Sequence, residues 1–386
     1  MGHSQAERLA ALRLARSAEI GPITYRNLIE RFGGAVAALD ALPSIAARGG
    51  RAAQIRIASS AQAQTEIEHA EAIGARLIVL GEPEYPALLA AAEPAPPVLF
   101  IRGNLDLFAR SAISIVGARN ASANGRKLAQ SLAAGLGARG HVIVSGLARG
   151  IDAAAHKGSL GTGTIAVLAG GIDQIYPEEH RALAEDITEH GALVTEMPFG
   201  HVARAVDFPR RNRIIAGLSR ATLVVEAAER SGSLITARLA LELGREVFAV
   251  PGSPLDARCR GTNGLLRDGA VLTETPDDVE AHLPPLEASL QPPLLRARTH
   301  TQPALDFTAP ARAASPRGRL EIDATDSSQP LGVRILELLG PSPTAIDELV
   351  RETGASAADI QAALFDLELE GLALRHPGQQ VSRSSA

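Results

Sequence analysis

The stretch from residue 208 to residue 252 restricts the fold more than any other, because it holds two strand signals separated by a helix. Uninterrupted apolar, β-branched runs cover 221–225 and 247–250, a pattern typical of buried parallel strands. The segment 233–243 between them has helical spacing. The stretch therefore predicts a β-α-β unit.

The loop that enters this helix predicts a phosphate site. It is small and rich in donors and consists of Arg230, Ser231, Gly232 and Ser233. Backbone N–H groups and the helix dipole can hold an anion there. Just upstream, Arg211 and Arg213 offer guanidinium forks that suit phosphate, with Asn212 between them. The stretch contains no nucleophile–base pair that would cut what it holds.

Four further strand signals precede this unit and alternate with helical segments. They lie at 113–116, 141–144, 164–168 and 192–195. About six buried strands that alternate with helices predict an α/β fold with a doubly wound parallel sheet. Right-handed crossovers then place every loop that follows a strand along one rim, and the clusters of Gly, Ser and Arg all fall in these loops.

The flanking segments predict further units around this central domain of residues 76–283. Residues 1–75 are helical in period, which fits either a helix-hairpin-helix DNA module or a plain helical bundle, and favours the bundle. Prolines punctuate 77–103 and favour edge strands and tight turns. Residues 284–330 are rich in Pro, Ala, Ser and Thr without a period, so we expect a flexible linker.

Residues 331–386 read as three short helices and a hairpin, the pattern of a winged helix, with Thr344 and Ser356 as expected N-caps. The third helix is acidic and carries Asp359, Asp366, Glu368 and Glu370. Carboxylates facing a phosphate backbone would be repelled. We expect this unit to contact protein or to serve the structure, and not to read a duplex.

Composition narrows the class of protein. A net charge of −5 over 386 residues argues against a chain that coats nucleic acid with its whole surface, but allows a local basic groove. Aromatic residues make up 3% without any Trp, which disfavours binding mainly through stacked bases. A single cysteine, Cys259, and the lack of an apolar run of membrane-spanning length predict a cytoplasmic protein without a membrane span.

Two loops call for a functional and a plain interpretation. Gly117-x-Arg119-x-x-Ser122 after a strand can bring phosphate to the backbone, to an arginine fork and to a hydroxyl, or can be an ordinary turn. Ser145, Asp152 and His156 could be catalytic, but an Asp–His pair at a helix start more often fixes a loop. The sequence contains no full dinucleotide fingerprint, no P-loop and no nucleophile elbow. We expect no metal and no cofactor.

These motifs together resemble the DNA-processing protein A (DprA/Smf) family. The resemblance rests on GARNAS, SGLARGIDAAAH, TIAVLAGGIDQIYP, FPRRNRIIAGLS, VVEAAERSGSLITARLALELGREVFAVPG and GTNGLLRDGA, which cover most of residues 80–283. It implies an extended Rossmann domain that binds single-stranded DNA without marked sequence preference. It also implies a homodimer that helps to load the RecA recombinase during natural transformation.

The resemblance assigns a DNA groove without catalytic residues. Arg119 would bind phosphate, and Phe208 would stack a base. The other groove residues that the motifs imply are Gly117, Ser122, Ser145, Gly146, Arg149, Gly150, Gly170, Gly171, Arg204, Arg211, Asn212, Arg213, Ser231, Gly232 and Ser233. Asp207 departs from the usual pattern before FP and leaves the local charge to Arg204.

The alternative is an enzyme that hydrolyses nucleotides or nucleoside phosphates on a similar sheet. The P-G-G-x-G-T-x-x-E typical of that class is absent, and its nearest match is the segment 169–173. We therefore expect a single-stranded DNA-binding recombination mediator and no enzyme.

Overall fold

The computed structural model describes residues 3–48, 56–285, 329–376 and 379–384. In this part of the chain, one large sheet has nine strands in the order β1-β2-β6-β5-β4-β3-β7-β8-β9. The strands are β1 (Ala75–Val79), β2 (Val98–Gly103), β3 (Ala112–Gly117), β4 (Val142–Ser145), β5 (Thr164–Val167), β6 (Ala192–Thr195), β7 (Ala221–Val225), β8 (Glu246–Ala249) and β9 (Val271–Leu272). All pairs from β6 to β9 are parallel, whereas β1 and β2 join antiparallel at one edge. The predicted doubly wound parallel sheet and its proline-punctuated edge are confirmed.

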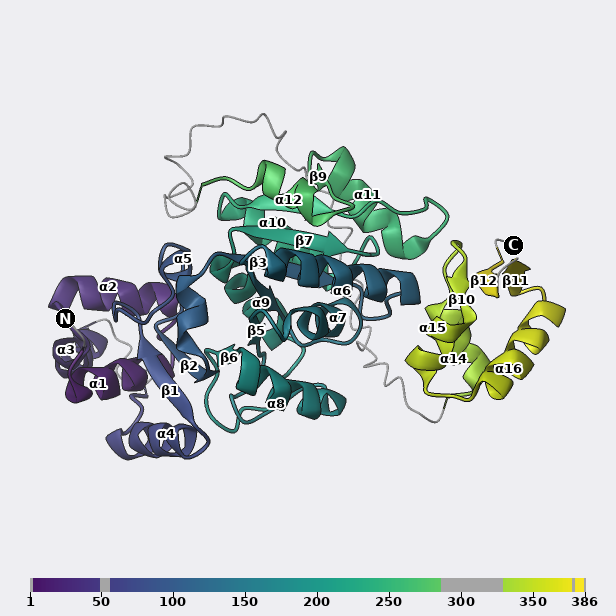
Figure 1. Ribbon diagram of the computed structural model, residues 1–386. Helices are drawn as coiled ribbons and strands as arrows, with labels where there is room; N and C mark the ends of the chain where they lie inside the picture. Colours follow the sequence, from purple (N-terminus) through teal and green to yellow (C-terminus); the bar gives the residue numbers. More distant parts are fainter. Residues whose placement is uncertain (1–2, 49–55, 286–328, 377–378, 385–386) are drawn as a thin grey trace.

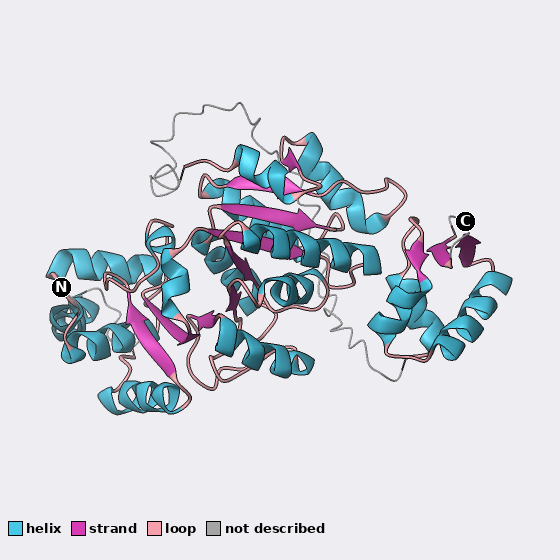
Figure 2. Ribbon diagram, in the orientation of Figure 1, coloured by secondary structure: helices cyan, strands magenta, loops and turns pink. Residues whose placement is uncertain are grey.

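Helices cover both faces of the sheet (Figures 1 and 2). One face packs against α6 (Ala123–Ala138), α7 (Ile151–Ser159) and α8 (Arg181–His190), and the other against α9 (Asp207–Leu218), α10 (Gly232–Glu242) and α11 (Arg260–Arg267). Alternate residues of a strand face opposite layers, as Ile143 and Val144 of β4 do. The strands are buried on both faces, which explains why their sequences are continuously apolar.

α6 and α7, which carry part of the candidate site, approach each other closely. A Cβ on Gly158 of α7 would lie 2.3 Å from the carbonyl oxygen of Gln130 in α6. Only glycine fits at this contact, so the pair forms a firm layer on its face of the sheet.

The N-terminal helices pack onto the antiparallel edge of the sheet. They are α1 (Gln5–Arg16), α2 (Pro22–Phe32), α3 (Ala35–Arg48) and α4 (Ser60–Ala72). Breaks that contain Gly21 and Gly33 separate α1, α2 and α3, and Gly33 ends α2 in a left-handed conformation with φ 78°. Their buried residues form one apolar cluster with β1, β2 and α8, so this helical unit shares a core with the central domain. Two short helices lie elsewhere on the sheet: α5 (Ala87–Ala90) packs against α9, and α12 (Pro276–His282) packs against α6 and β9.

The C-terminal unit is the predicted winged helix. It contains α14 (Leu331–Leu338), β10 (Thr344–Ala345), α15 (Ile346–Thr353), α16 (Ala357–Leu369), β11 (Ala373–His376) and β12 (Gln380–Arg383) around its own apolar core. Ser356 caps α16 as expected. The expectation for Thr344 is wrong: Ala345 is the N-cap of α15, because Thr344 pairs with Val381 in a small sheet.

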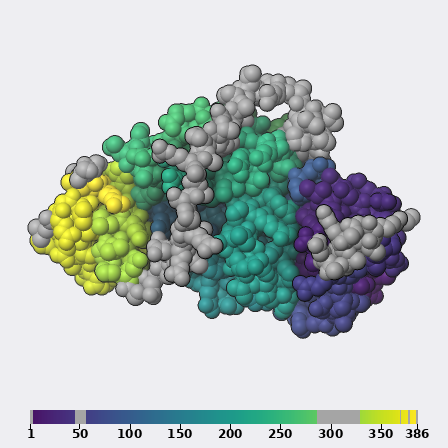
Figure 3. Space-filling view, turned by 180° about the vertical axis from the view of Figure 1, so that it is seen from behind, coloured from purple at the N-terminus to yellow at the C-terminus, as the bar shows by residue number. Residues whose placement is uncertain are grey.

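The N-terminal helices and the winged helix lie at opposite ends of the molecule, with the large sheet between them (Figure 3). The predicted linker at 284–330 lies almost entirely outside the described residues. Among the described residues, no helix is long and apolar enough to span a bilayer.

Candidate nucleic-acid interface

The carboxyl ends of the parallel strands form one rim of the sheet, and the strand order reverses there at β3. This strand lies between β4, which follows it in the chain, and β7, which is added much later. A reversal of this kind leaves a crevice beyond the strand ends, where ligands of open α/β sheets commonly bind. The loops after β3 and β7 are therefore the natural place for a site.

The N-terminus of α6 at this crevice is occupied by a carboxylate of the chain itself. Glu226, directly after β7, accepts hydrogen bonds from the backbone N–H of Ser122 at 2.8 Å and from its hydroxyl. The same hydroxyl accepts a hydrogen bond from the N–H of Gly125 and so caps α6. The expected contact of Ser122 with DNA phosphate does not fit this arrangement, because both of its donors are engaged. A phosphate here would have to displace a buried carboxylate.

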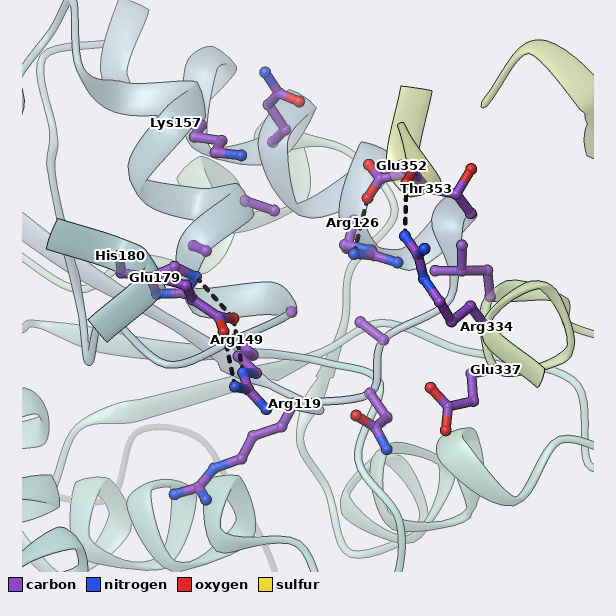
Figure 4. A pocket seen from close by; sticks show the side chains of 17 residues that line it. Arg119, Arg126, Arg149, Lys157, Glu179, His180, Arg334, Glu337, Glu352 and Thr353 are labelled. Carbon is purple, nitrogen blue, oxygen red and sulfur yellow. Dashed lines mark hydrogen bonds and ion pairs between the residues drawn. The ribbon is translucent and has the colours of Figure 1, made fainter. Parts of the chain in front are cut away.

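Three side chains, two from loops and one from the first turn of α9, form a surface beside the crevice that can hold a nucleotide. The Arg119 guanidinium carbon lies 5.1 Å from the centre of the Phe208 ring, and the Tyr176 ring meets Phe208 edge-on at 5.5 Å. Arg119 is exposed (Figure 4) and makes no ion pair within the described part of the chain. Phe208 is half-buried, and Tyr176 is 42% exposed. An arginine fork beside two accessible rings suits phosphate and base together. We call these three residues the arginine–aromatic cluster.

Glycines hold the Arg119 loop close to its neighbours. A Cβ on Gly117 would lie 1.9 Å from the carbonyl oxygen of Val225, and one on Gly150 would lie 2.3 Å from that of Ala118. Gly150 also has φ 74°, which side chains rarely adopt. Gly117 and Gly150, both predicted groove residues, thus set the course of the backbone under Arg119.

Arg211 lies beneath the surface and not in the groove. Its side chain is buried, and Nη1 donates hydrogen bonds to the carbonyls of Gly146 at 2.6 Å and Val167 at 2.5 Å. Burial lowers the pKa of Arg211 to about 10, although the nearby Asp152 carboxylate opposes the shift. Asp152 in turn accepts hydrogen bonds from the N–H groups of Gly146 and Ala148. In this structure Arg211 does not present its guanidinium to the groove, as was expected for a direct contact with phosphate; it links the loop after β4 to the end of β5.

Ser145 and His156 also have structural partners. The Ser145 hydroxyl donates to the carbonyl of Ile115 at 2.6 Å, and His156 Nδ1 lies 2.7 Å from the Thr164 hydroxyl. Both side chains are fully buried, and burial lowers the pKa of His156 to about 3. A neutral imidazole bound to a threonine cannot activate a serine that points elsewhere. The geometry fits the interpretation that Ser145, Asp152 and His156 fix the loop, and it moves Ser145 out of the predicted groove.

Arg149 and Arg204 reach the surface with acidic partners. Both ends of the Arg149 fork bind Glu179, at 2.7 Å each. Arg204 has a 71% exposed side chain with Nε 3.5 Å from Asp207. Asp207 is buried and accepts hydrogen bonds from His201 and from the backbone of Arg204. Burial alone would raise the pKa of Asp207, but these hydrogen bonds outweigh it and hold the pKa below its usual value.

The remaining predicted residues on α9 connect it to its surroundings. Asn212 Nδ2 donates to the carbonyl of Gly232 at 3.3 Å, at the start of α10. Arg213 donates to the carbonyl of Pro94 and pairs with the buried Glu196. Asn212 and Arg213 therefore position α9 and do not present free donors to solvent.

Most of the predicted groove residues in the glycine and serine turns are buried or cap a helix, and one of them is exposed. Gly170 and Gly171 are buried beneath the 198–201 loop, where a Cβ on Gly171 would lie 2.5 Å from the Pro198 carbonyl oxygen. Ser231 caps α10 by accepting a hydrogen bond from the N–H of Ser233. Gly232 between them is exposed and has space around it.

A polar pocket of about 420 Å³ extends from the Arg119 loop to the winged helix (Figure 4). Its basic residues are Arg119, Arg126, Arg149, Lys157 and Arg334, and its acidic residues are Glu179, Glu337 and Glu352. Arg126 and Lys157 were missed by the sequence interpretation, since isolated cations in amphipathic helices look like an ordinary solvated face. Tyr176 was missed too. Its position in an exposed loop of a chain with few aromatic residues was the available signal.

The chain matches three sequence profiles. Residues 76–284 match the family described as DNA recombination-mediator protein A, 5–69 a DprA-like N-terminal HHH domain, and 321–379 a DprA winged helix domain. The N-terminal match corresponds to the helix-hairpin-helix alternative of the sequence analysis. Together the profiles cover each unit that the sequence analysis delimited, apart from most of its linker.

Individual relatives agree with these profiles. Protein Smf of Synechocystis is 36% identical over 312 residues, which are 78% of each chain. The X-ray structure of DNA processing protein A from Streptococcus pneumoniae matches with a TM-score of 0.61 and 32% identity, over 74% of this chain and 99% of that one. A structure of DNA processing protein A from Helicobacter pylori, described by its single-stranded DNA binding mode, matches with a TM-score of 0.50 and 27% identity over 54% and 95%. The chain therefore belongs to the DNA-processing protein A (DprA/Smf) family.

Proposed function

We propose that this chain binds single-stranded DNA along the rim of its large sheet, with the arginine–aromatic cluster as the central contact. The observation that carries the proposal is the exposed Arg119, which has no ion pair among the described residues and lies over the Phe208 ring. One nucleotide could place its phosphate on the guanidinium group and its base against Phe208 or Tyr176. Arg149 and Arg204 are partly or fully exposed nearby, and phosphate would compete with their carboxylate partners.

Such a site would bind DNA with little sequence preference. Arginine forks and rings contact phosphates and base faces, which all nucleotides share, and leave base edges unread. The low aromatic content is compatible with this, because the cluster needs only two rings. Arg211, Asn212, Arg213, Asp152 and the glycines would act indirectly by fixing the loops.

The family and the relatives support the same proposal. The Helicobacter pylori protein is described as binding single-stranded DNA, and the profile over residues 76–284 carries the description of a recombination mediator. We extend the proposal to a homodimer that protects incoming DNA and helps to load RecA during natural transformation, without chemical turnover.

The alternative of a nucleotide hydrolase has less support in the geometry. Glu226 fills the helix N-terminus at which a nucleotide phosphate would bind, and Ser145 and His156 point to structural partners. Purified protein should therefore release no product from nucleoside phosphates or from single-stranded DNA, with or without Mg²⁺. Turnover that His156→Ala abolishes would refute the mediator proposal.

Binding itself is tested by fluorescence anisotropy with labelled single-stranded oligonucleotides of unrelated sequence and with the matching duplex. We expect similar affinities among the single strands and weaker binding of the duplex. Equal binding of duplex and single strand would argue against the cluster as the contact, since duplex bases are not free to stack on its rings.

A further inference from the structure

We propose that the surface formed by Arg126, Gln130 and Lys157 is a second stretch of the DNA path, which the winged helix covers with Glu337 and Glu352 when no DNA is bound. The proposal rests on the proposed function, because this path begins at the arginine–aromatic cluster. We call these three residues the covered wall.

The covered wall continues the path in geometry and in charge. Arg126 and Gln130 are four residues apart and share one side of α6, and Lys157 lies on α7, which packs against it. Arg119 and Arg149 line the same pocket (Figure 4). A strand that leaves Arg119 in this direction would meet further cations and an amide that line the same pocket.

The winged helix places carboxylates where phosphates of that strand would lie. Glu352 at the end of α15 pairs with Arg126 across 2.8 Å, and Glu337 of α14 lines the same pocket. Burial lowers the pKa of Arg126, and Glu352 opposes this shift. Arg126 Nε is buried and finds no hydrogen-bond partner among the described residues, so the pairing with Glu352 leaves one donor unused. A phosphate bound through both Nε and Nη would satisfy it.

The described attachments of the winged helix include hydrogen bonds and an ion pair, which water or DNA can replace, so the unit can be released. Arg258, held in place by Asp256, donates to the carbonyls of Glu337 at 2.9 Å and Leu339 at 2.8 Å, at the C-terminal end of α14. Asn124 adds a long hydrogen bond of 3.4 Å to Pro343. The apolar core of the winged helix is separate from those of the sheet. Polar interfaces of this kind between domains commonly open.

The consequence is competition that depends on DNA length. A strand of about six nucleotides would fill only the arginine–aromatic cluster and leave the winged helix in place. A strand of about twenty nucleotides would gain the contacts of the covered wall only after it displaced Glu337 and Glu352. The carboxylates of the winged helix would thus occupy the places of DNA phosphates along the path.

The test uses the full chain with the double substitution Glu337→Gln/Glu352→Gln and, as a matched control, Glu370→Gln on an exposed position of the same unit. Affinity for short and long oligothymidylates is measured by anisotropy at low salt. We expect the double variant to bind the long strand about fivefold more tightly than the wild type, while the short strand is unaffected. Glu370→Gln should match the wild type with both lengths.

Amide hydrogen exchange measures independently whether the winged helix leaves the covered wall. Amides of 346–353 and 339–343 should lose protection when the wild type binds the long strand, and in the DNA-free double variant. Equal long-strand affinity of the double variant and the control, or tighter protection of 346–353 with DNA, would overturn the proposal. If neither wild type nor variant bound any single strand, the proposed function would fail instead. Binding by the double variant alone would support both.

Discussion

Arg119→Ala and Phe208→Ala offer the sharpest test of the site, because they should weaken binding in distinguishable ways. Arg119 is exposed and unpaired in the described structure, so its loss removes a charge-assisted phosphate contact without breaking an internal one. Such contacts contribute about 1.5–3 kcal/mol, and solvent exposure places this one near the lower end. Arg119→Ala should then raise the Kd about tenfold for every single-stranded sequence.

The dependence of binding on salt separates charge from stacking. Each phosphate contact to single-stranded DNA contributes about 0.7 to the slope of log K against log salt. Arg119→Ala should reduce the magnitude of the slope by about this amount. Phe208→Ala should weaken binding by about 1–3 kcal/mol but leave the slope unchanged, since it removes a neutral stacking surface.

The assay is anisotropy titration of oligothymidylates over a series of salt concentrations. Arg267→Ala is the matched control, because Arg267 is exposed in the last turn of α11 and is not among the residues that line the pocket beside Arg119. Arg119 is exposed, so its substitution should change the free energy of unfolding by no more than about 0.5 kcal/mol. An Arg119→Ala variant with the affinity and slope of the Arg267→Ala variant would refute the assignment.

Three further predictions concern the scaffold under the site. Arg211→Ala should destabilise the fold by about 3 kcal/mol, because it leaves two buried carbonyls and Asp152 without their cationic partner. Calorimetry should then show a lower Tm. An unchanged Tm would mean that Arg211 does not stabilise these loops. Because the pKa of Asp207 is lowered in the folded state, its stabilising effect is complete above the unfolded value of about 3.9 and is lost as pH falls through the folded pKa. Urea unfolding of Asp207→Asn should show a deficit at neutral pH that shrinks on acidification, and a deficit independent of pH would contradict this. Gly117→Ala should cost at least about 2 kcal/mol, because its Cβ would lie 1.9 Å from a carbonyl oxygen, whereas Gly232→Ala has open space and should be tolerated; equal unfolding midpoints would disprove the packing argument.

Hydrophobic pattern alone was enough to predict the six central strands of the sheet, but it did not reveal β9. The runs at 113–116, 192–195 and 221–225 coincide with β3, β6 and β7 to within a residue, because strands buried on both faces must be apolar throughout. Cap signals were less dependable. Ser356 caps α16, but Thr344 has the same local signal and is drawn into a strand by its pairing with Val381.

The candidate site was predicted as a rim but not in its details. Sequence motifs brought Arg119, Arg211 and Phe208 to the same rim, and residue type alone did not distinguish a surface arginine from a brace. Arg211 is buried because the loops after β4 and β5 leave their carbonyls facing α9, and its guanidinium is the nearest donor that can satisfy them. Tyr176 joins the cluster only through the tertiary contact with Phe208.

The sequence by itself determined the alternation of strands and helices in the central domain and the edge of the sheet at which the polar loops gather. These depend on local periodicity and on the handedness of crossovers, which are properties of neighbouring residues. Tertiary structure alone decided which donors stay free. Ser122 meets Glu226 from 104 residues further along the chain, and Arg126 meets Glu352 across two units, whereas Arg119 meets the face of a ring and no carboxylate among the described residues. A charged or polar side chain can have its partners inside the fold or remain available to a ligand. Contacts between distant segments decide which, and no local pattern encodes them.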